Sequence, residues 1–395
     1  MTLFVMVFFY YGIVNKENIS KTAKIETEEK KMITSSIFNA IAELAKSAEI
    51  EKGTIKENMD SICEVLEEEI LKSEASDEEK KAMLKRLRTF CNTETNIMLV
   101  GGTGCGKSST INALFSCGNT GNEEDADYVE VAKVGSKADP ETKDIEKYTI
   151  GNLVLWDTPG FGDGTEIDEH HKDIIQELLR ESDEDGNALI DIVLVILDGS
   201  TKDLGTSYKI LNDIIIPELK NDTSRILVAL NQSDIAMKAG RHWDYEKNEP
   251  DETLITFLEE KVNSIKSRIK EDSGLDIEPV YYCAGYREET GDTVYPYNLS
   301  KLLYYILSSL PAQKRVAVME GINTDSQNYE HNDDDMDYNE ELKESWESSF
   351  DYISDGIDSG AEIGKTILGI PGMVVGGIIG GFVGCIRGIV DGIFG

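Results

Sequence analysis

The sequence has 395 residues, of which 75 are acidic and 39 basic, and its formal net charge is −36. This charge repels phosphate backbones and anionic lipid head groups wherever it is spread evenly, so nucleic acid is not expected as a partner. The length fits one main domain with appendages. The six cysteines show neither metal-ligand spacing nor a disulfide framework, which predicts a reducing, cytoplasmic location.

The first 90 residues read as an N-terminal extension followed by a helical region. Residues 1–14 are apolar but shorter than the roughly 20 residues that span a bilayer, and no cleavage site follows them. Three alternatives remain for these residues. They are an extension of little consequence, with the natural start at Met32, or they form a core strand, or they make a weak membrane contact. From residue 17 to residue 90, apolar positions recur at helical spacing, which predicts helices.

Short apolar runs alternate with helical stretches between residues 96 and 315. The runs begin at residues 96, 152, 190, 225 and 278, and the helices are expected near 108–116, 167–182, 203–219, 253–271 and 298–310. Buried strands that alternate with crossover helices are typical of a parallel-rich sheet covered on both faces. We therefore predict an α/β domain over residues 91–315.

The first motif of this domain is GGTGCGKS, residues 101–108, between a predicted strand and a predicted helix. Glycines let such a loop wrap closely around phosphates, whose oxygens bind backbone N–H groups at the helix N-terminus. Lys107 supplies a charge to the β and γ phosphates, and Ser108 offers an oxygen to Mg²⁺. The residues expected to contact the nucleotide here are Gly101, Thr103, Gly104, Cys105, Gly106, Lys107, Ser108 and Ser109.

The second motif is DTPG, residues 157–160, at the end of the predicted strand LVLW. A carboxylate at the C-terminal end of a strand can hold Mg²⁺ through water, and a glycine N–H can reach the γ-phosphate. We expect Asp157 to serve the metal and Gly160 the phosphate.

The third motif is NQSD, residues 231–234, which closes another apolar strand. The Asp234 carboxylate can accept hydrogen bonds from N1–H and the 2-amino group of guanine, a pattern that adenine does not offer. Asn231 can donate to the phosphate loop and brace it. Ala284, in YYCAGY, follows a further strand, where its N–H would meet guanine O6; the alternative is a plain core strand end.

The chain beyond residue 315 divides into an acidic and a glycine-rich part. Residues 316–358 hold fourteen acids against one lysine, which predicts a solvated acidic linker over 316–350 and an amphipathic and glycine-zipper tail over 351–395. Residues 333–344 match the acidic positions of an EF-hand loop, but Tyr338 stands where that loop needs glycine, so we read a chance match.

Glycines stand at every fourth position of the tail, at residues 376, 380, 384, 388 and 392, and residues 366–386 carry no charge. This length can cross a hydrocarbon layer, and glycines four apart let two helices approach closely. Three alternatives remain: membrane contact through residues 366–395, packing against the N-terminal helices or another copy, or a flexible tail.

Together, the motifs GGTGCGKS, DTPG and NQSD and the strand end YYCAGY resemble those of the Era/TrmE-like GTPases, the group labelled as 50S ribosome-binding GTPase domains. The likeness covers about residues 92–315 and is greatest to bacterial proteins, often carried on prophages, with an apolar C-terminal segment. It implies a P-loop NTPase G domain that uses GTP/GDP and Mg²⁺.

The resemblance also implies residue roles. Gly101, Gly106, Lys107 and Ser108 bind the phosphates and Mg²⁺, Asp157 and Gly160 the metal and γ-phosphate, and Asn231 and Asp234 the base. Gln232 and Ala284 are expected to contact the nucleotide beside them. The family's switch I threonine, a Mg²⁺ ligand in the triphosphate state, is matched best by Thr142, with Thr149 as the alternative. Lys107, Thr142 and Gly160 form the expected catalytic set.

Three positions depart from the family pattern. Gln232 replaces the usual lysine, which predicts weaker nucleotide affinity; Phe161 stands where Ras-type enzymes place a water-orienting glutamine; and Gly104 stands where potassium-assisted members carry asparagine. The resemblance therefore implies slow intrinsic hydrolysis, accelerated by an unknown protein partner or by a homodimer across the nucleotide face. Asp163, His170 and His171 are the candidates in cis, although an exposed histidine pair is more often plain surface.

We expect a slow GTP-dependent molecular switch, cytoplasmic or held at the inner face of the membrane. The alternatives are a membrane-tethered or self-associating scaffold controlled by GTP, a ribosome-associated assembly GTPase, and an ATP-using P-loop enzyme. The acidic charge and the lack of a basic KH-like module weigh against the ribosomal role.

Overall fold

The computed structural model describes residues 60, 63–64, 67–68, 70–71, 76–116, 131–132, 145–161, 165–182, 186–201, 204–219, 222–237, 240–287, 293–346 and 393–394. The chain divides into two compact units. Residues 1–51, 64–87 and 353–386 form the first, and residues 52–63, 88–352 and 387–395 form the second. The second unit contains the sheet and the motifs.

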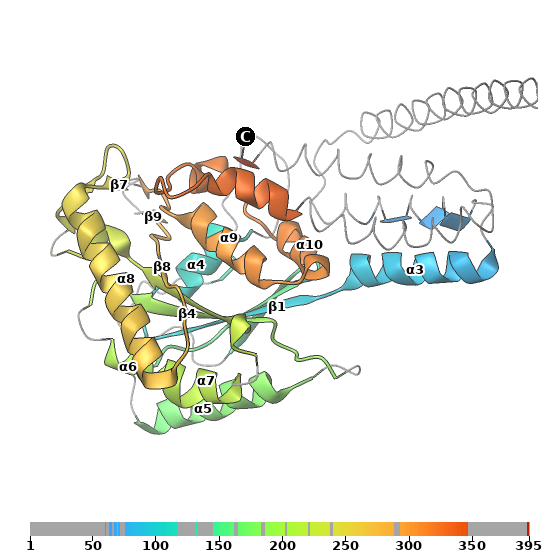
Figure 1. The fold of residues 1–395 in the computed structure, drawn as a ribbon, viewed down its shortest axis with the longest axis horizontal. Coiled ribbons are helices and arrows are strands. Elements are labelled where there is room, and N and C mark those ends of the chain that lie inside the picture. Colours follow the sequence, from blue (N-terminus) through green and yellow to red (C-terminus); the bar gives the residue numbers. More distant parts are fainter. Residues whose placement is uncertain are drawn as a thin grey trace, which may run out of the picture. The chain divides into compact units, whose positions relative to one another are not determined.

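A six-stranded sheet with the order β2-β3-β1-β4-β5-β8 forms the centre of the second unit (Figure 1). Its strands are β1 (Thr95–Gly101), β2 (Glu146–Ile150), β3 (Leu153–Asp157), β4 (Ile192–Asp198), β5 (Ile226–Asn231) and β8 (Val280–Tyr281). Only β2 runs antiparallel to its neighbour among these strands, whereas β3, β1, β4, β5 and β8 are parallel. The predicted α/β fold with a parallel-rich sheet is confirmed.

The central strands are buried on both faces, which explains their continuous apolar sequences. All seven residues of β1 are buried, and so are the first six of β4. Since successive side chains of a strand point to opposite faces, such a strand has no polar side to expose.

Helices cover both faces of the sheet (Figure 1). One face carries α4 (Lys107–Leu114), α9 (Leu299–Ser309) and α10 (Ala312–Glu320), which contact strands β1, β3 and β5. The other face carries α5 (Thr165–Arg180), the π-helical stretch η1 (Leu211–Ile215) between α6 (Gly205–Ile210) and α7 (Ile216–Glu218), and α8 (Glu252–Ser273). Each of the five predicted helices of the domain is present, shifted by only a few residues.

Two small hairpins and short 3₁₀ turns complete the unit. The hairpins pair β6 (Trp243–Asp244) with β7 (Glu249–Pro250) and β9 (Tyr286–Arg287) with β10 (Thr293–Val294). The 3₁₀ turns are η2 (Thr223–Arg225), η3 (Ser233–Ile235) and η5 (Ser326–Tyr329).

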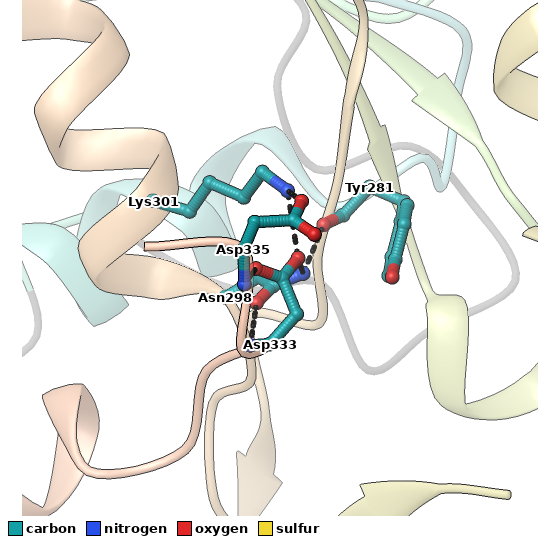
Figure 2. Close-up of polar contacts among 5 residues, drawn as sticks. All are labelled: Tyr281, Asn298, Lys301, Asp333 and Asp335. Carbon is teal, nitrogen blue, oxygen red and sulfur yellow. Dashed lines mark hydrogen bonds and ion pairs between the residues drawn. The ribbon is translucent and has the colours of Figure 1, made fainter. Parts of the chain in front are cut away.

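The segment predicted to be a solvated acidic linker folds onto the domain instead. Residues 316–346 include most of α10, the turn η5 and a helix over residues 338–346, and Tyr329, Tyr338, Leu342 and Trp346 are buried. Lys301 on α9 explains part of this difference, because its Nζ donates to Asp333 Oδ2 at 2.7 Å and to Asp335 Oδ2 at 2.6 Å (Figure 2). The count of acids alone does not reveal this ion pairing.

The residues flanking the domain are described only in part. The helix α3 (Asp77–Asn92) precedes β1, and Cys63 and Cys91 form a disulfide with a Cα–Cα distance of 6.6 Å, contrary to the expectation that the cysteines stay unpaired. The apolar residues 1–14 and the tail glycines lie outside the described residues. Within the described part, no helix has the length and apolar character needed to cross a bilayer.

Candidate nucleotide site

The predicted motifs meet at one edge of the sheet, where the parallel strands β1, β3 and β5 end. In the ladder, Leu99 pairs with Asp157 on one side and Leu194 on the other, and Asp198 pairs with Asn231. The carboxyl ends of parallel strands are where open α/β sheets bind ligands.

The loop between β1 and α4 has the backbone that its glycines were expected to allow. Gly104 and Gly106 have φ of 76° and 91°, in the left-handed region that favours glycine. Gly106 is the N-cap residue of α4, and a side chain there would collide with Asn231 Nδ2. Lys107 is buried at the first position of the helix, and its Nζ donates to the carbonyl oxygens of Gly101 (3.4 Å) and Gly102 (3.3 Å).

Ser108 and Asp157 are hydrogen-bonded to each other. The Ser108 hydroxyl donates to Asp157 Oδ2 at 2.7 Å, whereas Asp157 Oδ1 is buried and has no hydrogen-bond partner among the described residues. Burial raises the pKa of Asp157, and the hydrogen bond from Ser108 and the charge of Lys107 only partly oppose this. A hydroxyl beside a buried carboxylate with one free oxygen is a donor set that fits Mg²⁺.

The DTPG loop contacts the phosphate loop directly. Thr103 N–H donates to the Phe161 carbonyl at 3.1 Å, and Phe161 N–H donates to the Gly101 carbonyl at 3.3 Å. A Cβ on Gly160 would lie 2.5 Å from Thr103 Cα and 2.7 Å from its nitrogen, so only glycine allows this approach.

The Asn231 side chain joins the phosphate loop (residues 101–108) to the loop after β8 (residues 282–285), which we call the base loop. Its Nδ2 donates to the Cys105 carbonyl and its Oδ1 accepts from Ala284 N–H, both at 3.0 Å. The Ala284 N–H is thus already engaged in this structure, and its contact with guanine O6 stays a prediction.

Asp234 lies buried in the turn η3, three residues after Asn231. Burial raises the pKa of the carboxyl, and a hydrogen bond from the Cys283 thiol partly offsets the rise. Gln232 is in the left-handed region with φ of 62°, and its Nε2 donates to the Gly104 carbonyl at 2.8 Å. The glutamine side chain therefore reaches over to the phosphate loop.

Two contacts of the site were not anticipated from the sequence. The hydroxyls of Thr110 on α4 and Tyr282 after β8 are 2.6 Å apart in the interior, a link between the helix α4 and the loop after β8. His171, expected at the surface beside His170, is buried and packs edge-on against Phe161 with ring centroids 6.1 Å apart. Adjacent residues of an α-helix point in different directions, so His170 and His171 of α5 do not face the same side. The sequence therefore carries a signal for the second contact.

The positions of the remaining predicted residues do not add to the geometry of the site. Thr149 lies in β2, and Ser109 is part of α4. Thr142 and Asp163 lie outside the described residues, so the switch I threonine is not placed. The described residues contain no group of three or more His, Cys, Asp or Glu side chains arranged to hold a metal ion.

A glycine loop at a helix N-terminus, a buried lysine, a Ser–Asp pair and an Asn–Asp base motif at the ends of parallel strands define a P-loop GTPase domain. Residues 96–232 match the family described as 50S ribosome-binding GTPase, and this likeness supports GTP/GDP and Mg²⁺ as the cofactors. No curated protein matches the sequence significantly.

Solved structures of GTP-binding proteins resemble the chain at low identity. Era from Aquifex aeolicus, bound to GDP and AlF4⁻, is 20% identical with a TM-score of 0.34, over 55% of this chain and 57% of its own. A probable GTP-binding protein, EngB, is 18% identical (TM-score 0.30; 54% and 98%). Toc33 from Arabidopsis thaliana with Mg²⁺ and GMPPNP is 16% identical (TM-score 0.35; 63% and 97%).

Proposed function

We propose that this protein is a slow, GTP-dependent molecular switch that hydrolyses GTP to GDP and phosphate. The observation that carries the proposal is the Asn231 side chain, which connects the phosphate loop to the base loop beside the buried Asp234. This arrangement fixes the distance between a phosphate site and a base site, as recognition of a whole nucleotide requires.

The phosphate role falls to Lys107 and the loop amides. A helix N-terminus provides unpaired N–H groups and a favourable potential for anions. The Lys107 ammonium, held among the loop carbonyls, lies where it can exchange these partners for phosphate oxygens. Positioning and charge stabilisation of the transferred phosphoryl group are then the main catalytic contribution of the protein.

Ser108 and Asp157 are the residues that would hold Mg²⁺, with Thr142 as a further ligand predicted from sequence. When bound, the metal neutralises charge on the β and γ phosphates. Asp157 Oδ1 has no hydrogen-bond partner among the described residues, which supports this assignment, because a buried carboxylate oxygen without a partner is costly in a site that serves no ligand.

Base selection falls to Asp234. Its carboxylate can accept two hydrogen bonds from guanine, whereas adenine offers an acceptor at N1 and no 2-amino group. Gln232 contributes through the Gly104 carbonyl rather than through a charge, which supports a weaker affinity than a lysine at this position would give.

Hydrolysis without a partner is expected to be slow. Phe161 has no polar group with which to orient a water molecule, and His171 is buried against it. A protein effector or a second copy across the nucleotide face would supply the missing charge. Arginine residues brought in this way raise rates by roughly 10³–10⁵-fold in other GTPases.

Nucleotide binding to the full-length protein tests the proposal. GDP and GTP should bind with Mg²⁺ and ATP should not, and Lys107→Ala should abolish hydrolysis. Asp234→Asn should shift preference towards xanthosine nucleotides, since xanthine carries a C2 carbonyl that an amide NH₂ can reach. Asp222→Asn, an exposed control, should leave the preference unchanged. Preference for ATP, unaltered by Asp234→Asn, would refute the guanine assignment.

The narrower roles stay predictions from sequence. Membrane contact through residues 366–395 predicts pelleting with liposomes that is lost when these residues are removed. A nucleotide-controlled scaffold predicts GTP-dependent self-association. A ribosome-associated role predicts salt-sensitive co-sedimentation with ribosomal subunits.

A further inference from the structure

The segment after α10 covers the C-terminal end of the P-loop helix α4. Backbone bonds join them, from Ser116 N–H to the Gly321 carbonyl (2.9 Å) and from Asn323 N–H to the Leu114 carbonyl (2.8 Å). The last carbonyls of a helix lack partners within the helix and need outside donors. The folded segment 316–346 therefore completes α4 at the end opposite to the nucleotide.

Three side chains of this segment donate to the last turn of α4. Asn323 Nδ2 donates to the Asn112 carbonyl at 3.2 Å, Asn328 Nδ2 to the Ala113 carbonyl at 3.1 Å, and the Tyr329 hydroxyl to the Leu114 carbonyl at 3.3 Å. All three donors are buried. A displacement of Tyr329 would thus break a hydrogen bond to the helix that begins with Lys107.

The Tyr329 ring also contacts the end of the chain. Phe394, the penultimate residue, lies with its ring centroid 4.9 Å from that of Tyr329 and 5.6 Å from that of Trp346. Ile393 and Phe394 are each only 6% exposed, and they belong to the same compact unit as the sheet. Trp346 is itself fixed, since its Nε1 donates to the Arg315 carbonyl at 3.4 Å.

We propose that Tyr329 and Trp346 form a docking site for the chain's own C-terminal residues Ile393 and Phe394, and that its occupancy is coupled to nucleotide binding through Tyr329 and α4. We call this pair of aromatic side chains the C-terminal seat. The occupant is intramolecular because Ile393 and Phe394 are buried in the same compact unit as the seat.

The coupling follows from linkage. A docked Phe394 holds Tyr329 against the Leu114 carbonyl and so stabilises the α4 end that the nucleotide site needs. Any ligand that favours the ordered α4 must then favour the docked tail by the same factor, because coupling between two binding events is reciprocal.

Fluorine NMR of the full-length protein labelled with 5-fluorotryptophan tests the docking. The sequence has three tryptophans, at 156, 243 and 346, and a Trp346→Phe variant assigns the third resonance. Phe394→Ala should shift the Trp346 resonance and leave the other two in place, and Phe394→Leu should shift it less. Met336→Ala, a change at an exposed position of the segment 316–346, should have no such effect.

If the chemical shift of Trp346 did not change in the Phe394→Ala variant, the proposed docking site would be wrong. A resonance that moves on dilution of the unmodified protein would also overturn it, because it would show that the occupant comes from a second copy. The two undisturbed tryptophan resonances report that the variant is folded.

The affinity for GDP tests the coupling, which rests on the proposed function. Phe394→Ala should weaken GDP binding by roughly fivefold or more, the usual lower range of allosteric coupling, and Met336→Ala should not. An unchanged affinity together with a shifted Trp346 resonance would overturn the coupling alone. If the unmodified protein bound no guanine nucleotide, the proposed function would fail, while the NMR experiment would still decide the docking.

Discussion

Asn231 Nδ2 donates to the carbonyl oxygen of Cys105 at 3.0 Å, across a sequence separation of 126 residues. The same side chain accepts from Ala284 N–H, so one buried amide connects three segments of the candidate site. The phosphate loop and the base loop are thereby held at a fixed separation by the protein itself. Preorganisation of this kind reduces the entropy lost on binding.

Replacing Asn231 with alanine should weaken both the fold and the site. The change leaves the Cys105 carbonyl and the Ala284 N–H without this partner in the interior, which costs about 2–4 kcal/mol of unfolding free energy for two such groups. Urea unfolding measures the loss, and GDP titration should show weaker binding. Asn212→Ala removes a more exposed hydrogen bond to Asp272 and should cost under about 1 kcal/mol. Equal losses in the two variants would contradict the bridging role.

Gly160→Ala should separate the DTPG loop from the phosphate loop. The new Cβ would lie 2.5 Å from Thr103 Cα, so the hydrogen bond from Thr103 N–H to the Phe161 carbonyl could not persist. Overpacking of this kind costs about 1–3 kcal/mol, and a displacement of about 1 Å at the γ-phosphate can slow hydrolysis by about 10²-fold. In the control variant Gly102→Ala, the new Cβ lies 3.8 Å from the nearest atom. The melting temperature of this variant should therefore stay near that of the unmodified protein.

The core of the site was predictable because each motif carries its own local context. Lys107 follows a strand and opens a helix, and Asp157 and Asn231 each close an apolar strand, so the parallel topology alone brings them to one edge. The acidic segment was not predictable in this way. Its partner Lys301 lies 32 residues before Asp333 and on another element, and counting charges treats every acid as solvated.

The disulfide and the buried histidine show the same limit. Cys63 and Cys91 are 28 residues apart, and no motif marks their contact. His171 resembles a surface histidine in sequence, and the packing of α5 turns it towards Phe161. A contact between distant segments decides the disulfide, whereas for His171 the helical period of α5 carries a partial signal.

The ion pairs of Lys301 should differ in energy although their lengths are similar. Asp333 and Asp335 contact the same Nζ at 2.7 and 2.6 Å, but the exposed fractions of their side chains are 11% and 70% (Figure 2). Asp333→Asn should cost about 2–4 kcal/mol, because removing a buried partner leaves a charge poorly compensated. Asp335→Asn should cost under about 1 kcal/mol, as exposed pairs do. Thermal or urea unfolding of this matched pair checks the prediction.

Asn298 strengthens the ion pair between Lys301 and Asp333. Its Nδ2 donates to Asp333 Oδ2 at 2.9 Å, and its Oδ1 accepts from Asp333 N–H at 2.7 Å. The buried site also affects Tyr281, since burial and then the charge of Asp333 raise the pKa of its hydroxyl to about 12. If Asp335→Asn proved as costly as Asp333→Asn, burial would not be the deciding variable.

Gln232→Lys should raise nucleotide affinity without changing base preference. A lysine at this position can still donate to the Gly104 carbonyl and adds a positive charge near the phosphate loop. We expect GDP and GTP to bind roughly 3–10-fold more tightly, about 1 kcal/mol. Gln327→Lys makes the same charge change at an exposed position and should have little effect. A gain in both variants would point to net charge instead of the site.

Asp157→Asn should stabilise the nucleotide-free protein and impair its use of Mg²⁺. Burial raises the pKa of Asp157 in the folded state, so folding favours the protonated carboxyl. The stability contributed by this protonation is fully present below the unfolded pKa of about 3.9 and is lost as the pH rises through the folded value. Asparagine cannot ionise, yet its Oδ1 can still accept from Ser108.

The variant should therefore unfold at a higher denaturant concentration than the unmodified protein at pH 7, and the advantage should shrink as the pH falls towards 4. Urea unfolding curves between pH 4 and pH 8, recorded without added metal, measure this difference. GDP binding should meanwhile lose most of its dependence on Mg²⁺, because the free oxygen that fits the cation is gone. Reduced stability at pH 7 would mean that Asp157 is held by favourable contacts that the Ser108 hydrogen bond alone does not account for.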